Sequence, residues 1–155
     1  MFELKIAHAH CDIPCKIYDP IVSLVAGLSV VRLTDILLDL ESVESMSGQA
    51  QLARIVARKE IEAQKVKDEV NIIWGDYFKE PQIKDFPEVH NIVHGIMRLG
   101  SQCKQEISKE AAQELVKALN SFADIFWRTK GIETQRVIAP YPPALPVIVP
   151  ILESA

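Results

Sequence analysis

The sequence has few glycines and few aromatic residues, and its charged residues show no cationic excess. It holds 6 glycines among 155 residues, and 6% of the residues are aromatic whereas 48% are hydrophobic. This composition favours a helical globular protein over a disordered chain or a β-sandwich. The formal net charge of −4 argues against nucleic acid as a principal partner, because nucleic-acid-binding domains carry a basic surface. The length suits one domain with a hydrophobic core.

Several common catalytic and structural patterns are also missing from the sequence. It contains no glycine-rich phosphate loop, no nucleophile elbow and no carboxylate dyad. Its three cysteines, two of them close together, do not make a disulfide framework. Large classes of nucleotide-binding and hydrolytic enzymes are therefore excluded.

Neither an export signal nor a membrane-spanning helix is expected. Residues 1–9 are too short for the apolar core of a secretory signal, and they contain Glu3. Residues 20–31 are apolar but end at Arg32, which is too short to cross a bilayer. Residues 137–152 carry no charge, yet five prolines interrupt them. We therefore predict a soluble, cytoplasmic protein with no membrane partner.

Two cysteines and a histidine stand within six residues near the start of the chain, in a segment that reads His-Cys-Asp-Ile-Pro-Cys. Thiolate and imidazole ligands suit nickel, copper or zinc better than magnesium or calcium. If His10 were the first residue, its amine, its imidazole, and the amide nitrogen and sulfur of Cys11 could chelate one metal. Cys15 would supply a second sulfur, with Pro14 limiting the turn between the cysteines. Nickel accepts two nitrogens and two sulfurs in one plane, whereas zinc usually does not.

This chelation requires a free amine at His10, because a peptide nitrogen there would be a poor ligand. We therefore expect cleavage after Ala9 by a maturation protease, which makes residues 1–9 a leader peptide. An ordinary N-terminus is the alternative for this segment. An oxidised pair of Cys11 and Cys15 is the alternative for the two cysteines.

Residues 10–20 resemble the metal-binding hook of the nickel-containing superoxide dismutases, which reads His-Cys-Asp-X-Pro-Cys-Gly-X-Tyr-Asp-Pro. Residues 74–79 with 86–90, and residues 126–130, are similar to two further family segments in order and spacing. Together the matches extend over nearly all of residues 10–131. The resemblance implies a four-helix bundle, a homohexamer, and dismutation of superoxide to oxygen and hydrogen peroxide at one nickel ion per subunit.

The resemblance also implies which residues form the site. The metal ligands would be the amine and imidazole of His10, the amide nitrogen of Cys11, and the sulfurs of Cys11 and Cys15. Tyr18 and Tyr77 match two family tyrosines beside the open face of the metal. Their phenols would hold ordered water, guide the small anion and supply protons.

The hook departs from the family at Lys16, where the family has glycine. A lysine at this position costs nothing if its backbone dihedrals are ordinary. If the position needs a positive φ, we expect a strain of about 1 kcal/mol or more.

A second departure concerns the residues that orient the His10 ring. The family uses a glutamate in its first helix and an arginine in its second, and counting from the motifs places Ala26 and Glu62 at these positions. We predict that Glu62 accepts a hydrogen bond from the His10 ring, which adds Glu62 to the catalytic set with Tyr18 and Tyr77. The alternative is that Glu62 pairs on a solvated face with a lysine; the candidates are Lys59, Lys65 and Lys67.

Other histidine and cysteine residues are also candidate metal ligands. His90 and His94 share one helix face, but Asn91 follows His90 where a zinc protease has glutamate, and no third ligand is evident, so we favour a structural role. Cys103 is predicted to be a small buried residue. The competing function is a non-enzymatic module in which the uncleaved chain binds zinc; its ligands would be His8, His10, Cys11 and Cys15.

The predicted fold is an all-α antiparallel four-helix bundle with an N-terminal metal-binding hook and a Pro-rich C-terminal extension. Capping residues and apolar spacing predict helices over residues 19–40, 50–78, 87–104 and 108–130, with a break at residues 44–48 and a loop at 80–85. The hook and bundle form one domain, residues 10–131.

Residues 132–155 are predicted to form a Pro-rich apolar tail, within which residues 139–146 should be extended, near polyproline II. This tail could pack on the bundle or across a subunit boundary, or it could be a peptide ligand for another protein. We favour packing, because its apolar residues would otherwise be exposed.

Overall fold

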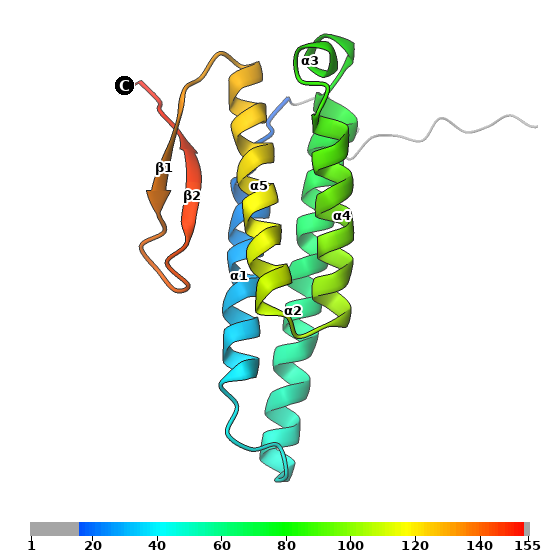
Figure 1. The fold of residues 1–155 in the computed structure, drawn as a ribbon, viewed down its shortest axis with the longest axis vertical. Coiled ribbons are helices and arrows are strands. Elements are labelled where there is room, and N and C mark those ends of the chain that lie inside the picture. The colour runs from blue at the N-terminus through cyan, green and yellow to red at the C-terminus, as the bar shows by residue number, and fades with distance from the viewer. Residues whose placement is uncertain (1–15, 154–155) are drawn as a thin grey trace, which may run out of the picture.

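The computed structural model describes residues 16–153 and shows four long helices with a β-hairpin along one side (Figure 1). The predicted four-helix bundle is confirmed, whereas the leader and the hook ligands lie outside the described residues. In chain order the elements are α1 (Ile21–Leu38), α2 (Met46–Ile72), the π-helical turn η1 (Ile73–Tyr77), α3 (Glu80–Asp85), α4 (Val89–Gln105), α5 (Lys109–Thr129), β1 (Thr134–Ile138) and β2 (Pro146–Pro150).

Helix α1 is apolar on most sides and packs against both α2 and α5. Its start is capped by the Asp19 carboxylate, which accepts the backbone N–H of Ile21 at 2.8 Å. Gly27 allows a close approach to α5, since a Cβ at this position would lie 2.6 Å from a Leu119 methyl group. By length and composition alone, α1 could span a membrane, so the prediction that this segment is too short is wrong. Half of the helix is nevertheless buried inside the bundle, which accounts for its apolar character.

Helix α2 is longer than predicted at its start and changes character at its end. The Ser45 hydroxyl accepts the N–H of Gly48 at 3.0 Å, so the helix begins at Met46, inside the predicted break. At the other end the last turn before Phe78 is a π-helix. Apolar spacing at intervals of three and four gave no indication of this wider turn.

The predicted loop at residues 80–85 is wrong, because these residues form the short helix α3. Pro81 lies in its first turn, where a missing N–H has no consequence for helical hydrogen bonding. Helices α4 and α5 lie within two residues of their predicted bounds. Ser108 caps α5 by accepting the N–H of Ala111 at 3.1 Å, and Gly131 ends it with a φ of +69°.

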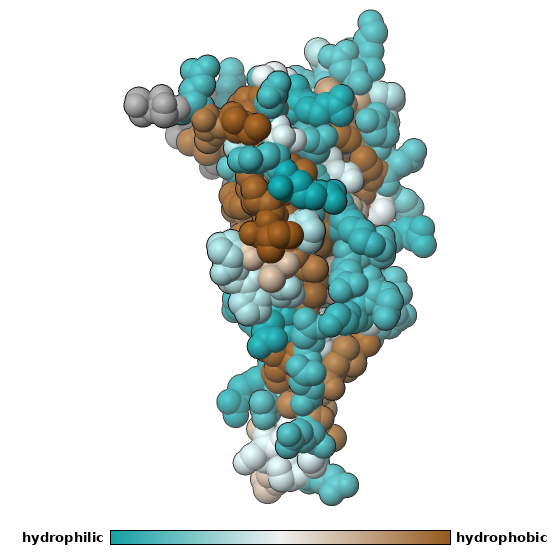
Figure 2. Space-filling view, turned by 60° about the vertical axis from the view of Figure 1, so that its left-hand side comes forward, coloured by the Kyte–Doolittle hydropathy of each residue, from teal (hydrophilic) through white to brown (hydrophobic). Residues whose placement is uncertain are grey.

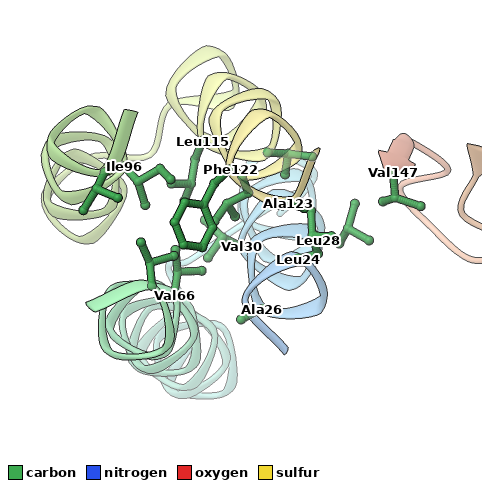
Figure 3. Packing of buried hydrophobic residues seen from close by; sticks show 14 of the residues in the cluster. Leu24, Ala26, Leu28, Val30, Val66, Ile96, Leu115, Phe122, Ala123 and Val147 are labelled. Atoms are coloured by element: carbon green, nitrogen blue, oxygen red, sulfur yellow. The ribbon is translucent and has the colours of Figure 1, made fainter. Parts of the chain in front are cut away.

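The hydrophobic core lies between the four long helices, with the Phe122 ring of α5 at its centre (Figure 3). Fully buried side chains from the other three helices surround this ring, and they include Val30, Val66 and Ile96. Burial of these apolar side chains is the main source of bundle stability.

Lys59 is a charged residue inside the core, with 1% of its surface exposed. Its ammonium donates to the carbonyl oxygens of Cys103 and Glu106, which are otherwise unpaired at the end of α4. Burial lowers the pKa of Lys59, because the charged form loses its hydration. Burial likewise raises the pKa of the Cys103 thiol to about 11, which keeps it protonated and unreactive. Cys103 is therefore the small buried residue that was predicted.

The tail forms an antiparallel β-hairpin and residues 139–145 make the turn that joins its strands, so the prediction of polyproline II over residues 139–146 is wrong. Both strands are rich in β-branched residues, and Val137 of β1 pairs with Val147 of β2, while the prolines lie at the ends of β2 and in the connection between the strands. The prediction that the tail packs on the bundle is confirmed, because Val147 points toward the helices and is buried (Figure 3). Apolar side chains remain exposed over the hairpin (Figure 2), and they include Ile138, Tyr141, Ile151 and Leu152.

Asn120 of α5 fastens the hairpin to the bundle. Its side-chain oxygen accepts the N–H of Ile148 at 2.7 Å, and its amide nitrogen donates to the Pro146 carbonyl at 2.9 Å. Pro146 and Pro150 have no N–H, so Ile148 presents the one donor on this edge of β2. Asn120 therefore pairs with the single N–H donor of this edge, which leaves the edge no free donor for another strand.

We expect Asn120→Ala to loosen the hairpin without unfolding the helices. Loss of the acceptor leaves the Ile148 N–H unpaired, which costs about 1–3 kcal/mol. Amide hydrogen exchange at Ile148 should accelerate while helical circular dichroism stays unchanged, and Ser121→Ala, on the exposed side of α5, is the control. Unchanged exchange at Ile148 would show that Asn120 does not hold the hairpin.

Candidate metal centre

The candidate metal centre is the hook, and the described chain begins immediately after it. His10, Cys11 and Cys15 lie outside the described residues. Their chemistry fits nickel, because two thiolates and an imidazole are soft or borderline ligands. Within residues 16–153, no group of three histidine, cysteine or acidic side chains is arranged to hold a metal ion.

The structure brings together the two tyrosines that were predicted to flank the metal. Tyr18 comes just before α1, and Tyr77 comes from the π-helical turn after α2. Their ring centroids lie 6.0 Å apart at an interplanar angle of 53°. The Tyr77 ring also packs on Phe126 of α5, at 4.8 Å between centroids. The segment that follows the hook is therefore held where α2 and α5 end.

Two residues near the end of α5 contact Tyr77 and were not among the predicted site residues. The Tyr77 hydroxyl is 2.6 Å from the Thr129 hydroxyl, and the Lys130 ammonium lies 4.8 Å from the centre of the Tyr77 ring. Both belong to the segment 126–130 that resembles the family. Their place in that segment was the only signal in the sequence, and it did not distinguish them from their neighbours.

Lys16 adopts a φ of +59°, in the left-handed region that favours glycine. This is the condition under which a strain of about 1 kcal/mol was expected at this position. Its side chain is exposed, and within the described part of the chain it makes no hydrogen bond or ion pair that would offset the strain.

Glu62 lies on α2 at the inward edge that was predicted, with 6% of its surface exposed. Its carboxylate forms an ion pair with Arg58 at 2.5 Å, so the alternative pairing with a lysine on a solvated face is wrong. Glu62 lines a hollow of about 440 Å³ between α1, α2 and the hairpin turn. The lining also includes Ser29, Arg32 and Tyr141.

His90 takes part in a structural contact. The Trp74 indole N–H donates to Nδ1 of His90 at 3.0 Å, and the two rings meet edge to face. An indole nitrogen can only donate, so Nδ1 of His90 is the acceptor and carries no proton. This bond joins η1 to α4 and agrees with the structural role favoured for His90.

Comparison with known proteins places the chain in a family. The family model described as nickel-containing superoxide dismutase matches residues 5–130. The proteins named superoxide dismutase [Ni] from Streptomyces coelicolor and Streptomyces seoulensis are each 30% identical over 125 residues, covering 79% of this chain and 88% of each relative.

Solved structures of nickel superoxide dismutase share the fold. The native structure at 1.30 Å has a TM-score of 0.69 and 29% identity, covering 78% of this chain and 99% of that one. A structure with nickel ligation corresponding to the oxidised state has a TM-score of 0.71 and 28% identity, covering 79% and 99%. The family match ends at residue 130, so the hairpin lies beyond it. The chain belongs to the nickel-containing superoxide dismutases, and its activity is the dismutation of superoxide with nickel as cofactor.

Proposed function

We propose that the mature chain begins at His10 and holds nickel through His10, Cys11 and Cys15, with Tyr18 and Tyr77 at the open face of the metal. The contact between the Tyr18 and Tyr77 rings is the observation that supports this placement. Cys15 is three residues from Tyr18, so their Cα atoms lie within about 11 Å of each other. The hook is therefore attached at the end of the bundle where both tyrosines lie.

Bound nickel supplies one-electron chemistry between Ni(II) and Ni(III), which two thiolates and a deprotonated amide make accessible. The chain's own residues attract the substrate and control the water around it. The two phenols hold water beside the hook, and this water can accept and release protons.

Positive charge beside the tyrosines assists the approach of superoxide. The Lys130 ammonium lies over the Tyr77 ring, and within residues 16–153 it forms no ion pair with a carboxylate. Lys16 is exposed at the beginning of the described chain. In a protein with a net charge of −4, these two cations make this end locally attractive to a small anion.

Glu62 is proposed to orient the His10 ring. Glu62 and Ser29 line the same hollow, and Ser29 lies about 13 Å along α1 from Pro20. The resemblance implies that the family supplies a glutamate and an arginine from two helices, whereas here Glu62 and Arg58 both come from α2.

Assembly and maturation complete the proposal. Residues 1–9 are removed by a protease, a nickel-loading factor supplies the metal, and identical subunits assemble into a hexamer in the cytoplasm. Ile21 and Val25 form a short exposed apolar stripe one turn apart on α1, and Ile17 is exposed just before the helix. Such a stripe supports packing of α1 against another copy of the chain.

The test of this function combines processing with ligand removal. Protein that begins at His10 and contains nickel should be fully active, whereas Cys11→Ser or Cys15→Ser should abolish activity and leave helical circular dichroism unchanged, because the hook precedes the bundle. Cys103→Ser is the control and should keep nickel and activity, since Cys103 is buried. Full activity in protein that still begins at Met1, or zinc in place of nickel, would contradict the proposal.

We expect Glu62→Gln to keep nickel but lower the turnover about tenfold, because an amide holds the His10 ring less strongly than a carboxylate. The nickel(III) spin-resonance spectrum should change as the axial ligand weakens. Glu60→Gln, on the exposed side of α2, is the matched control. Unchanged turnover and an unchanged spectrum in Glu62→Gln would show that Glu62 serves only its ion pair with Arg58.

Lys16→Gly should tighten nickel binding about fivefold, because glycine adopts the positive φ without the strain of about 1 kcal/mol. Lys16→Ala is the matched control, since it removes the charge and keeps the strain. The measurement is the nickel affinity of each variant in the form that begins at His10, determined by competition with a chelator. Equal affinities for the glycine and alanine variants would show that the hook does not depend on this dihedral angle.

A further inference from the structure

Two consecutive hydrogen bonds connect the Tyr77 phenol to the backbone of α5. The hydroxyl oxygens of Tyr77 and Thr129 lie 2.6 Å apart, and by distance alone either could be the donor. The Thr129 hydroxyl also lies 2.6 Å from the carbonyl oxygen of Phe126, one turn earlier in the helix. Both distances are within the range of short hydroxyl hydrogen bonds.

The second bond determines the direction of the first. A carbonyl oxygen can only accept, so the bond between Thr129 and Phe126 uses the single hydroxyl proton of Thr129. Thr129 then has no proton left for Tyr77, and the phenol must be the donor. The reverse direction would leave two acceptor oxygens 2.6 Å apart with no proton between them.

The ring contacts keep the phenol in this position. Tyr77 lies against Tyr18 and Phe126, and the Lys130 ammonium is 4.8 Å from the Tyr77 ring and 5.1 Å from the Phe126 ring. An ammonium over an aromatic face is attracted to it, so Lys130 helps to hold both rings. These contacts therefore keep the Tyr77 oxygen beside the Thr129 hydroxyl.

We propose that Thr129 is a positioning residue for the dismutase reaction. It accepts the hydrogen bond that the Tyr77 phenol donates, so that the Tyr77 oxygen acts only as a hydrogen-bond acceptor toward the metal site. This inference rests on the proposed placement of Tyr77 beside the hook. An acceptor phenol offers no hydrogen bond to superoxide or to another small anion. It accepts instead from water or from the product hydrogen peroxide, so the site does not retain anions through Tyr77.

The hydrogen bond can be tested in metal-free protein by nuclear magnetic resonance. A phenol proton engaged with Thr129 should exchange slowly with water and show a nuclear Overhauser contact to the Thr129 side chain. Thr129→Ser keeps the hydroxyl and should keep this proton signal, whereas Thr129→Val has the same shape without the acceptor and should lose it. Tyr77→Phe assigns the signal. Its persistence in Thr129→Val would overturn the inference without affecting the proposed function.

The effect on the site can be tested in nickel-loaded protein, with azide as a small-anion probe. Thr129→Val frees the phenol proton, so azide should inhibit at least about tenfold more strongly, as expected for one additional hydrogen bond to a charged group. Thr129→Ser should match the parent protein, and adding Tyr77→Phe to Thr129→Val should remove the gain. Unchanged azide inhibition in a variant that has lost the proton signal would overturn the positioning role and place Tyr77 away from the metal.

Discussion

The packing of Tyr77 between Tyr18 and Phe126 is the contact on which the site depends. Antiparallel helices bring the start of α1 and the ends of α2 and α5 to the same end of the bundle. The three rings join these ends, at centroid distances of 6.0 and 4.8 Å. The segment that begins at Lys16 and contains Tyr18 is thereby held next to residues from the last turn of α5.

Buried polar side chains connect the remaining parts of the molecule, and each pairs with a specific group. Lys59 satisfies carbonyl oxygens at the end of α4, and Asn120 pairs with the exposed edge of β2. Glu62 pairs with Arg58 at the hollow next to the hairpin turn. Buried polar groups are costly without partners, so these contacts favour one arrangement of helices and hairpin over shifted alternatives. The hairpin, which lies beyond the family match, is thus an integrated part of this chain's fold.

The long helices were predictable because their signals are local. Ser108 and Gly131 limit α5 by capping chemistry, and apolar residues at intervals of three and four show which face is buried. The π-helical turn and α3 were not predictable, because they depend on how the chain leaves α2 and on contacts such as the bond between Trp74 and His90. The hairpin was missed because proline content suggested an open conformation, whereas strand pairing and Asn120 determine the actual one.

The sequence by itself determined the chemistry of the hook, the family and the four helices, since ligand type, motif order and helical periodicity are properties of the chain. The tertiary structure alone decided the burial of Glu62, the contact between Tyr18 and Tyr77 and the direction of the Tyr77 hydrogen bond. Each of these depends on atoms brought together by folding. Thr129 and Tyr77 are far apart in the chain, and only the packing of α5 beside η1 sets their oxygens 2.6 Å apart.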